Sequence, residues 1–355
     1  MTTVVATVDL RSDTVTKPTR AMREAMMAAE VGDDVFGEDP SVKALESLSA
    51  EYLGKEAGLF VASGTMGNLV SLLTHCQRGD EILVSRGAHI FQYEQGGAAS
   101  LGGMLLNPLG SSKMEHLKAE DVAENISADD VHKPRTRLVC LENTLNGRVI
   151  AKETVDQICT VAKEKGLKTH LDGARLFNAA RALDLKPSSL VENIDTVQFC
   201  FSKGLAAPVG SMIVGPLSFI EEARRARKLV GGGMRQVGVL AAACKIALTE
   251  MVERLDEDHR NARKLAEAIN EMEYLRVNLD HCDTNMVWIE TQFEENSAED
   301  LVELLKKEGI LMLAISNSKI RAVTHHGITD SDIDRCVDII ATAAGKLGKK
   351  VKAKI

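Results

Sequence analysis

The feature that most limits the fold of this chain is a series of short apolar segments between residues 18 and about 230. Six of them have the length of a sheet strand buried on both faces: AGLFVAS, EILVS, RLVCLEN, KTHLD, TVQFCFS and GSMIVG. Stretches with helical periodicity, such as KETVDQICTVAKEKG, separate many of these segments. This alternation predicts an α/β fold with a mainly parallel sheet.

Two helices are expected before the first of these strands. PTRAMREAMMAAE begins with Pro18, which suits the first turn of a helix. SVKALESLSAEYLG ends at Gly54, a residue type that commonly follows a helix C-terminus. It carries four larger side chains on one stripe: Val42, Leu45, Leu48 and Tyr52.

A change of pattern near residue 256 predicts two domains. With 355 residues, 45% of them apolar, the chain can form one large core and a second, smaller one. After a glycine-rich stretch at 231–233 come two long helical patterns and then shorter segments such as NMVWIE, AEDLVELLKKEG and KIRAVTH. We therefore expect a large domain over residues 1–255, including an N-terminal segment 1–17, and a small C-terminal α+β domain over 256–355.

Charge and hydropathy argue against several classes of function. The formal net charge is −8 and the basic residues are dispersed, so we expect no nucleic-acid partner. No run approaches the ~18 apolar residues of a membrane-spanning helix, and the start MTTVVATVDL does not resemble a signal peptide. The seven cysteines lie far apart without zinc-like spacing and are expected to be reduced, mostly buried thiols, with no metal site. These features predict a cytoplasmic protein that does not bind membranes.

Polar residues cluster where the predicted strands end. Asp172 ends KTHLD, Lys203 follows TVQFCFS, Glu142 and Asn143 follow RLVCL, and SGTMGN follows AGLFVA. Because ligands of parallel sheets bind at the carboxyl ends of the strands, we expect these groups to line one site. His170, two residues before Asp172, is expected to share its face of the strand.

The turn from Ser63 to Thr65 lies between a predicted strand and the helical segment MGNLVSLLTHC. The backbone N–H groups of Ser63, Gly64 and Thr65, together with the helix N-terminus, are suited to bind a phosphate. On this segment alone the structural interpretation is favoured, because small residues are common in any tight strand-to-helix turn.

Lys203 needs an explanation, because an ammonium group at the end of a buried strand is poorly solvated. Pyridoxal 5′-phosphate requires from its protein a lysine that bonds to its aldehyde and a carboxylate, here Asp172, at its ring nitrogen. A buried ion pair between Lys203 and Asp172 would also explain both residues, so the two alone leave the question open.

Longer motifs decide between these alternatives: VDLRSDTVTKPT, VGDDVFGEDPS, VASGTMGN, GAHIFQYE, LDGARLFNAA, FSKGLAAPVGS, GGGMRQVGVLAAA and IRAVTH. By these motifs, which run from residue 8 to residue 325, the chain resembles the low-specificity L-threonine aldolases, a family of pyridoxal-phosphate enzymes. The resemblance implies fold type I, the aspartate aminotransferase fold. In this fold a large domain has a mainly parallel seven-stranded sheet, and a small C-terminal domain follows it.

The resemblance also assigns roles to individual residues. Lys203 would form the Schiff base with the cofactor, and Asp172 would face the ring nitrogen. His89 would lie over the ring and accept the proton of the substrate hydroxyl. The other cofactor-binding residues it implies are Gly64, Thr65, Met66, Arg175, Lys228 and Arg235, the last reaching a neighbouring subunit's phosphate. The residues it implies for the substrate carboxylate are Ser12, Arg175 and Arg321.

One position departs from the family pattern. Relatives usually have ENTHN and then a short Gly-Gly loop, whereas this chain has ENTLNGRVI, so Leu145 replaces a histidine that contacts the substrate hydroxyl. A positioned general base contributes roughly 10²–10⁴-fold, whereas the cofactor carries the harder part of the reaction. We therefore still expect an enzyme.

The reaction implied by the resemblance is retro-aldol cleavage of L-threonine or L-allo-threonine to glycine and acetaldehyde. This makes the chain an aldehyde-lyase of threonine catabolism and glycine biosynthesis. Two alternatives stay open: another pyridoxal-phosphate lyase, racemase or aminotransferase, and a non-catalytic protein that binds the cofactor, for which Leu145 is the support. Family members are typically homotetramers built from dimers, so we expect a homodimer or homotetramer with shared active sites.

Overall fold

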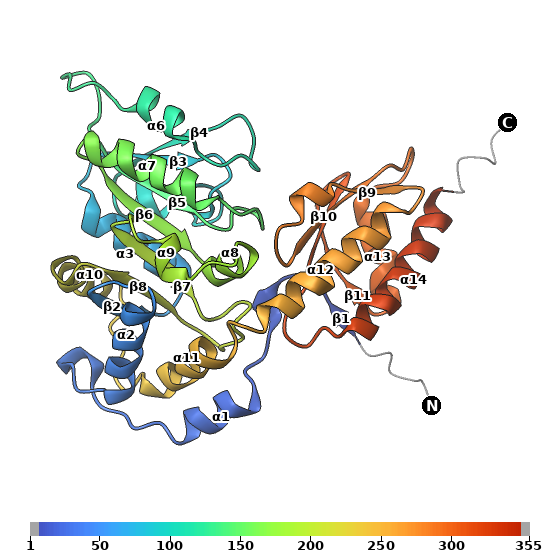
Figure 1. The fold of residues 1–355 in the computed structure, drawn as a ribbon, viewed down its shortest axis with the longest axis horizontal. Helices are drawn as coiled ribbons and strands as arrows, with labels where there is room; N and C mark the ends of the chain where they lie inside the picture. Colours follow the sequence, from blue (N-terminus) through green and yellow to red (C-terminus); the bar gives the residue numbers. More distant parts are fainter. Residues whose placement is uncertain (1–6, 349–355) are drawn as a thin grey trace. The chain divides into compact units, whose positions relative to one another are not determined.

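The computed structural model describes residues 7–348, shown in sequence colours in Figure 1. The first six residues of the expected N-terminal segment and the last seven of the expected C-terminal domain lie outside the described residues. By its internal contacts the chain divides into two compact units. The large unit consists of residues 17–252, and the small unit consists of residues 1–16 and 253–355.

The large unit contains a seven-stranded sheet in the order β2-β8-β7-β6-β5-β3-β4. β8 is antiparallel to both of its neighbours, and the other pairs of strands run parallel. The strands are β2 (Ala57–Val61), β3 (Glu81–Ser85), β4 (Leu105–Leu109), β5 (Thr136–Glu142), β6 (Lys168–Gly173), β7 (Thr196–Cys200) and β8 (Ser211–Gly215). The predicted α/β fold with a mainly parallel seven-stranded sheet is therefore confirmed.

Each of the six apolar segments predicted as strands contains a strand. Every residue of β3, β7 and β8 is buried, as expected for strands covered on both faces. The seventh strand, β4, has no such signal in the sequence. Its residues LLNPL include Pro108, it lies at the edge of the sheet, and Leu105 is 51% exposed, so no continuous apolar run marks it.

The helices of the large unit surround this sheet (Figure 1). They are α1 (Arg20–Met27), α2 (Pro40–Tyr52), α3 (Gly64–His75), α4 (His89–Gln92), α5 (Gly97–Ser100), α6 (Ala119–Asn125), α7 (Lys152–Glu164), α8 (Leu176–Ala182), α9 (Pro187–Leu190), α10 (Leu217–Leu229) and α11 (Gly238–Glu250). α3 packs against β6, β7 and β8, and its first residue follows the end of β2 closely. This helix therefore starts at the carboxyl edge of the sheet.

The predicted start of the first helix is wrong, whereas the predicted end of the second helix is close to the observed one. α1 begins at Arg20 because the side chain of Thr19 accepts a hydrogen bond from the backbone N–H of Met22. Pro18 therefore lies before the helix and not in its first turn, which corrects the prediction. α2 ends at Tyr52, and Gly54 adopts a left-handed φ of 63°, as expected for a glycine that follows a helix.

The small unit has the predicted α+β character. Its antiparallel sheet has the order β12-β13-β10-β9, with β9 (Leu275–Val277), β10 (Met286–Thr291), β12 (Leu313–Ser316) and β13 (Lys319–Val323). Three helices belong to it, α12 (Leu255–Asn270), α13 (Ala298–Lys307) and α14 (Asp330–Gly348). A separate pair of parallel strands joins β1 (Val8–Asp9) to β11 (Ile310–Leu311).

The N-terminal segment, expected in the large domain, contributes to the small unit. The N–H groups of Val8 and Leu10 donate to the carbonyl oxygens of Gly309 and Leu311 at 2.9 and 2.8 Å. Both side chains are buried in the core of the small unit. The pairing is explained by the alternation of Val8 and Leu10, which places both side chains in this core while their backbone bonds to the edge of β11. Division of the chain into domains at residue 256 stays a prediction.

Two further expectations concern membranes and cysteines. Among the described residues, no helix has the length and apolar character needed to cross a bilayer. All seven cysteines are free thiols, and six of them are buried, as predicted. Burial raises the pKa of the Cys159 thiol to about 11 and that of the Cys76 thiol to about 12.

Candidate active site

The carboxyl edge of the large unit's sheet gathers the polar residues expected there. Glu142 ends β5 and Asp172 lies at the end of β6, and the two residues are neighbours in the register of these strands. Lys203 follows β7, and His89 begins α4 shortly after β3. The parallel strands therefore place an amine, two carboxyl groups and an imidazole at the same edge, as predicted.

The carboxylate of Asp172 is buried and well supplied with donors. The residue is 2% exposed. One carboxylate oxygen, Oδ2, accepts a hydrogen bond from Asn68 Nδ2 at 2.8 Å, and the other, Oδ1, accepts one from the backbone N–H of Ala174 at 3.0 Å. These two bonds fix the orientation of the carboxylate.

His89 is held by two acidic side chains. Its Nδ1 lies 2.9 Å from Glu94 Oε1, and its backbone N–H donates to Glu142 Oε2 at 2.6 Å. Ligand atoms of His89, Glu94 and Asp172 all lie within 4.8 Å of one another. Burial raises the pKa of Glu94, an effect that the hydrogen bond from His89 partly offsets. The imidazole side chain remains 39% exposed, so a small molecule can reach it.

Glu142 is the carboxyl group whose proton affinity is most changed at this edge. Burial, followed by the negative charge of Asp172, raises its pKa to about 8. The hydrogen bond from the His89 backbone and the positive charges of Lys203 and Arg175 act in the opposite direction. Two carboxyl groups side by side and two cations around them form a site that can hold or release a proton near neutral pH.

The turn before α3 has the geometry expected for an anion site. Ser63 caps the helix: its Oγ accepts from the N–H of Met66 at 3.2 Å, and its carbonyl oxygen accepts from the N–H of Gly67 at 2.9 Å. Within the described residues, the N–H groups of Gly64 and Thr65 make no such bond, and they point out of the helix start. The N–H of Met66, a residue that the family resemblance implies for cofactor binding, is therefore already used in the cap.

Two glycines let α3 approach the sheet closely. A Cβ at Gly64 would lie 2.8 Å from Cys200 Sγ, and one at Gly67 would lie 2.6 Å from Gln198 Cγ. Larger residues at these positions would push the helix start away from β7. The sequence GTMGN therefore sets the distance between the predicted phosphate-binding turn and the strand that precedes Lys203.

The glycine-rich stretch after α10 lies beside the start of α3. A Cβ at Gly232 would lie 2.6 Å from Met66 Sδ, and one at Gly233 would lie 2.9 Å from Lys228 Cδ. The structure thus brings Lys228 and Met66, both predicted at the cofactor phosphate, to the same loop. The Lys228 side chain is exposed, as a lysine that meets a ligand from solution must be.

Arg235 extends from the same stretch but pairs within its own chain. Its guanidinium lies 2.9 Å from Asp33 Oδ2 and above the ring of Phe36, and its side chain is 53% exposed. Its backbone carbonyl accepts a hydrogen bond from the N–H of Asp34 at 3.1 Å. Arg235 is therefore positioned on the surface by residues 33–36.

Ser12 and Arg321, the other residues predicted to bind the substrate, both belong to the small unit. Ser12 Oγ accepts hydrogen bonds from the N–H and the hydroxyl of Thr14 at 3.2 and 2.9 Å. The guanidinium of Arg321 on β13 donates to the carbonyl oxygen of Arg11 at 3.1 Å. The small unit therefore brings Arg321 next to the backbone that carries Ser12, whereas Arg175 lies in the large unit.

Leu145, which replaces the family's histidine, occupies a tight loop after β5. The residue is 1% exposed. Its N–H donates to the carbonyl oxygen of Arg148, and the N–H of Arg148 donates back, both at 2.9 Å. The peptide bond from Asn143 to Thr144 is cis. This loop therefore has a defined backbone shape that brings Leu145 into the protein interior.

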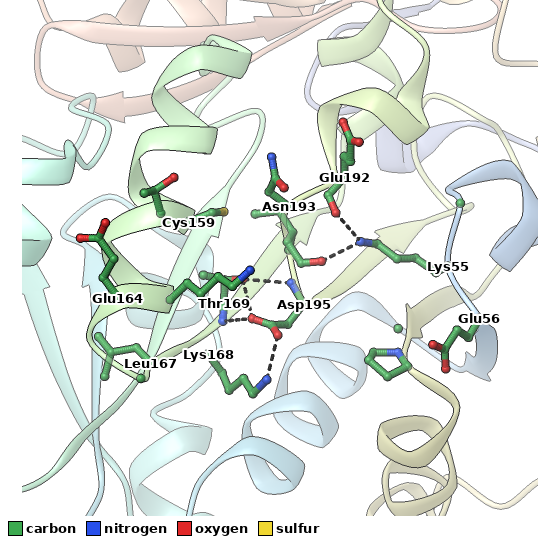
Figure 2. A pocket seen from close by; sticks show the side chains of 17 residues that line it. Lys55, Glu56, Cys159, Glu164, Leu167, Lys168, Thr169, Glu192, Asn193 and Asp195 are labelled. Atoms are coloured by element: carbon green, nitrogen blue, oxygen red, sulfur yellow. Dashed lines mark hydrogen bonds and ion pairs between the residues drawn. The ribbon is translucent and has the colours of Figure 1, made fainter.

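The opposite, amino edge of the sheet carries a pocket of about 900 Å³, shown in Figure 2. Several of its charged groups have hydrogen-bonding partners within the protein. Asp195 accepts hydrogen bonds from Lys168 Nζ, from the backbone of Thr169 and from the Thr169 hydroxyl, at 3.0, 2.9 and 2.9 Å. Lys55 Nζ donates to three backbone carbonyl oxygens, two of them within 3.0 Å. This pocket contains none of the predicted site residues.

Sequence reasoning gave no individual role to three residues that shape the carboxyl edge, namely Asn68, Glu94 and Glu142, although it expected Glu142 and the segment SGTMGN, which contains Asn68, to line the site. Asn68 lies in the second turn of α3 and reaches Asp172, more than 100 residues later. Glu94 follows His89 by five residues and lies beyond the end of α4, so no helical spacing in the sequence indicates their contact. Only Glu142 had a usable signal, since it ends a predicted strand beside that of Asp172.

Comparisons with known proteins agree with this geometry. A family model described as beta-eliminating lyase matches residues 9–292. Low-specificity L-threonine aldolase 1 of Arabidopsis thaliana is 47% identical over 337 residues, 93% of this chain and 94% of that protein. Alanine racemase TOXG of Cochliobolus carbonum is 35% identical over 344 residues, 93% of this chain and 86% of that protein.

Solved structures show the same fold. A threonine aldolase from Leishmania major has a TM-score of 0.81 and 18% identity, covering 95% of this chain and 99% of that chain. Because the family model spans most of the sequence and the match to the plant enzyme spans nearly all of it, the chain belongs to the beta-eliminating lyase family, among the threonine aldolases.

Proposed function

We propose that this chain is a pyridoxal-phosphate-dependent aldehyde-lyase that cleaves L-threonine or L-allo-threonine to glycine and acetaldehyde. One observation carries the proposal: the carboxyl edge of a fold type I sheet brings Lys203 and Asp172 together with His89 and the helix start at Gly64. An ordinary buried ion pair between Lys203 and Asp172 would not need the glycine turn or the imidazole. The reaction belongs to threonine breakdown and glycine formation.

The chemistry of this edge fits pyridoxal phosphate. Two N–H groups at the start of α3 suit its phosphate, and a buried carboxylate supplied with two hydrogen bonds suits its ring nitrogen. The absence of a side chain at Gly64 lets the start of α3 lie close to Cys200 at the end of β7, the strand that precedes Lys203. When bound, the cofactor withdraws electrons from the bonds at the substrate's Cα.

The chain's own residues divide the remaining tasks. We assign to Lys203 the covalent bond with the cofactor, and to Asp172 the constant negative charge at the ring nitrogen. We assign Gly64, Thr65, Met66 and Lys228 to the phosphate. Because Nδ1 of His89 is bonded to Glu94, its lone pair lies on Nε2, which is the nitrogen that accepts the proton of the substrate's β-hydroxyl.

Substrate binding rests on the arginines. Arg321 and Arg175, with Ser12, would bind the substrate carboxylate, since a planar guanidinium makes two parallel bonds to such a group. Leu145 offers no donor to the hydroxyl, so the two threonine diastereomers should react at similar rates. A strict preference for one diastereomer would contradict the view that Leu145 leaves the substrate hydroxyl without a donor.

The protein is proposed to act as a homodimer or homotetramer in the cytoplasm. We assign the exposed Arg235, which pairs with Asp33, to the phosphate in a neighbouring subunit. The buried thiols suit a reducing compartment. Sedimentation of the purified protein and of Arg235→Ala tests the assembly: a monomeric wild type would refute it, and unequal loss of cofactor affinity and association would separate the two roles of Arg235.

The decisive test is incubation of the purified, cofactor-loaded protein with L-threonine. We expect acetaldehyde and glycine in equal amounts, and a modified peptide that contains Lys203 after borohydride reduction. The similarity to an alanine racemase favours one rival. A parallel incubation with L-alanine tests that rival: D-alanine formed there, with no acetaldehyde from L-threonine, would establish a racemase, and a keto acid formed from L-threonine without acetaldehyde would establish another pyridoxal-phosphate activity. If only Leu145→His turned over threonine, the natural chain would be a non-catalytic cofactor-binding protein.

A further inference from the structure

A continuous chain of polar side chains runs along one face of the large unit's sheet towards Asp172. His75 Nε2 lies 2.7 Å from Thr196 Oγ1, and Thr196 Oγ1 lies 3.0 Å from His170 Nδ1. His170 Nε2 then lies 3.3 Å from Asn68 Oδ1, and Asn68 Nδ2 lies 2.8 Å from Asp172 Oδ2. The chain begins near the amino edge and ends at the carboxyl edge.

The strand register explains why these side chains meet. His170 pairs with Thr196 on β7, and Asp172 lies two residues further along β6, so all three face the same side of the sheet. α3 packs on that side and supplies Asn68 and His75, two residues separated by two helical turns. The predicted common face of His170 and Asp172 is thereby confirmed.

The two carboxylates that Asn68 contacts favour one direction of donation along this series of hydrogen bonds. Asn68 gives both of its amide hydrogens to carboxylates, Asp172 Oδ2 and Glu94 Oε1, each at 2.8 Å. Its carbonyl oxygen must then accept, so His170 carries its proton on Nε2. His170 Nδ1 is therefore an acceptor and takes the hydroxyl proton of Thr196, whose oxygen in turn accepts from His75.

Burial keeps the central members neutral and dry. His170 is fully buried and Asn68 is 1% exposed. Burial, reinforced by the neighbouring His75, lowers the pKa of His170 to about 3, so the ring stays neutral at physiological pH. A neutral ring has one donor and one acceptor, which is what this chain uses. His75 and Glu94 are the other titratable groups in contact with the chain.

We propose that Asn68 is a positioning residue that aims the carboxylate of Asp172 at the cofactor's ring nitrogen, and that His170, backed by Thr196, locks the amide of Asn68 in the donating orientation. This inference rests on the proposed function and extends it. If the amide were rotated by half a turn, its oxygen would face two carboxylates and its hydrogens would face the N–H of His170. His170 therefore decides which end of Asn68 meets Asp172.

The first test uses the unloaded protein with ¹⁵N-labelled histidine. We expect the ¹⁵N chemical shifts of His170 to be those of a neutral ring with its proton on Nε2 from about pH 6 to about pH 8. This range spans the ordinary pKa of histidine. Thr196→Val removes the hydroxyl donor and should give a mixture of tautomers, whereas Thr74→Val, whose hydroxyl bonds to the carbonyl oxygen of Val70, should not. A proton on Nδ1, or a charged ring, would overturn the inference.

The second test compares His170→Gln with His170→Leu. A glutamine amide can still donate to Asn68 Oδ1, whereas leucine fills similar space and cannot donate. We expect His170→Leu and Asn68→Leu to weaken pyridoxal-phosphate binding by about 10- to 100-fold, the effect of losing one hydrogen bond to a charged group. His170→Gln should stay close to the wild type. Equal affinities for the glutamine and leucine variants would refute the positioning role.

These two tests separate the inference from the function on which it rests. A wild type that binds no pyridoxal phosphate would overturn the proposed function and, with it, the role toward the cofactor. The tautomer of His170 in the unloaded protein would still decide whether the hydrogen-bonded chain exists. If the wild type binds the cofactor and the Asn68 and His170 variants bind it equally well, the inference is overturned and the proposed function stays intact.

Discussion

The two edges of the large unit's sheet differ in how completely their charges are paired. At the amino edge, beside the pocket of about 900 Å³, Asp195 and Lys55 each have three hydrogen-bonding partners (Figure 2). At the carboxyl edge, carboxyl groups are buried next to one another, and burial raises the pKa values of Glu94 and Glu142. At the amino edge, Asp195 and Lys55 therefore have their hydrogen bonds satisfied within the protein. At the carboxyl edge, the buried carboxyl groups of Glu94 and Glu142 are not fully compensated by their neighbours.

This difference shows why pocket size is a poor guide to function in this protein. A pocket whose charged side chains already satisfy one another gains little from a bound ligand, because each contact with the ligand would replace an existing one. A cluster of buried acids stores unfavourable energy that a positively charged ring would relieve. Chemistry is therefore expected at the carboxyl edge, as in other open parallel sheets.

The largest contrast is expected between two lysines, one at each edge. Lys203→Ala should lower kcat for acetaldehyde release by at least about 10³-fold, because it removes the residue that we propose to bond to the cofactor. Lys168→Ala removes an exposed amine that pairs with Asp195 and should leave kcat unchanged. A coupled assay for acetaldehyde, with cofactor content measured in parallel, checks both variants. A similar loss of kcat in both would show that the two edges do not differ in function.

A second contrast compares two aspartates with opposite roles. Asp172→Asn should reduce kcat by roughly 10²-fold or more, since the neutral amide no longer stabilises positive charge in the ring. Asp195→Asn should leave kcat unchanged and lower the free energy of unfolding by about 1–3 kcal/mol, because hydrogen bonds to a charged acceptor are lost. Urea denaturation and steady-state kinetics, measured on the same samples, test whether Asp172→Asn lowers kcat while Asp195→Asn lowers only the free energy of unfolding. Reduced kcat in Asp195→Asn would contradict it.

Much of this arrangement was predictable from the sequence, for a physical reason. Buried parallel strands need unbroken apolar runs, so β2, β3 and β5–β8 could be located, and with them the strand ends that carry Asp172 and Lys203. The edge strand β4 escaped because Pro108 and exposed side chains interrupt its pattern. The pairing of β1 with β11 could not be predicted because a strand of two residues does not reveal its partner.

What could not be predicted depends on partners far apart in the sequence. Asn68 meets Asp172 and His170 only because α3 packs over β6 and β7, a relation with no local signature. The paired charges of the amino edge have the same origin, since Lys55 bonds to carbonyl oxygens 136 to 139 residues away. The roles given to Ser12, Arg321 and Arg235 stay predictions based on family resemblance.

The pH dependence of stability should have opposite signs at the two edges. Burial and the nearby Asp172 raise the pKa of Glu142 from 4.5 to about 8, so the folded state holds a proton that the unfolded state releases. The stabilisation by Glu142 is therefore complete below pH 4.5 and lost as the pH rises through about 8. Burial alone would raise the pKa of Asp195, but hydrogen bonds from Lys168 and Thr169 lower it below 3.8. Its stabilisation is present above pH 3.8 and lost in acid.

Two substitutions separate the pH-dependent contributions of Glu142 and Asp195 to the free energy of unfolding. The difference in free energy of unfolding between the wild type and Glu142→Gln should move against the wild type as the pH rises from about 5 to about 8. The difference between the wild type and Asp195→Asn should be constant over that range and shrink towards about pH 3. Urea denaturation across the pH range measures both differences. A flat profile for Glu142→Gln would mean that Glu142 is already ionised in the folded protein.

The smallest effect is expected for Lys55, although it has more hydrogen bonds than most side chains at the amino edge. Burial lowers its pKa, which means that part of the energy of its three hydrogen bonds is spent on removing the ammonium from water. Lys55→Met keeps the packing of the aliphatic stem and removes both the bonds and this desolvation cost. The two changes oppose each other, so the free energy of unfolding should fall by no more than about 1 kcal/mol, with kcat unchanged. A much larger loss in urea denaturation would show that the carbonyl oxygens left without their donor dominate, and that the amino edge depends on this lysine.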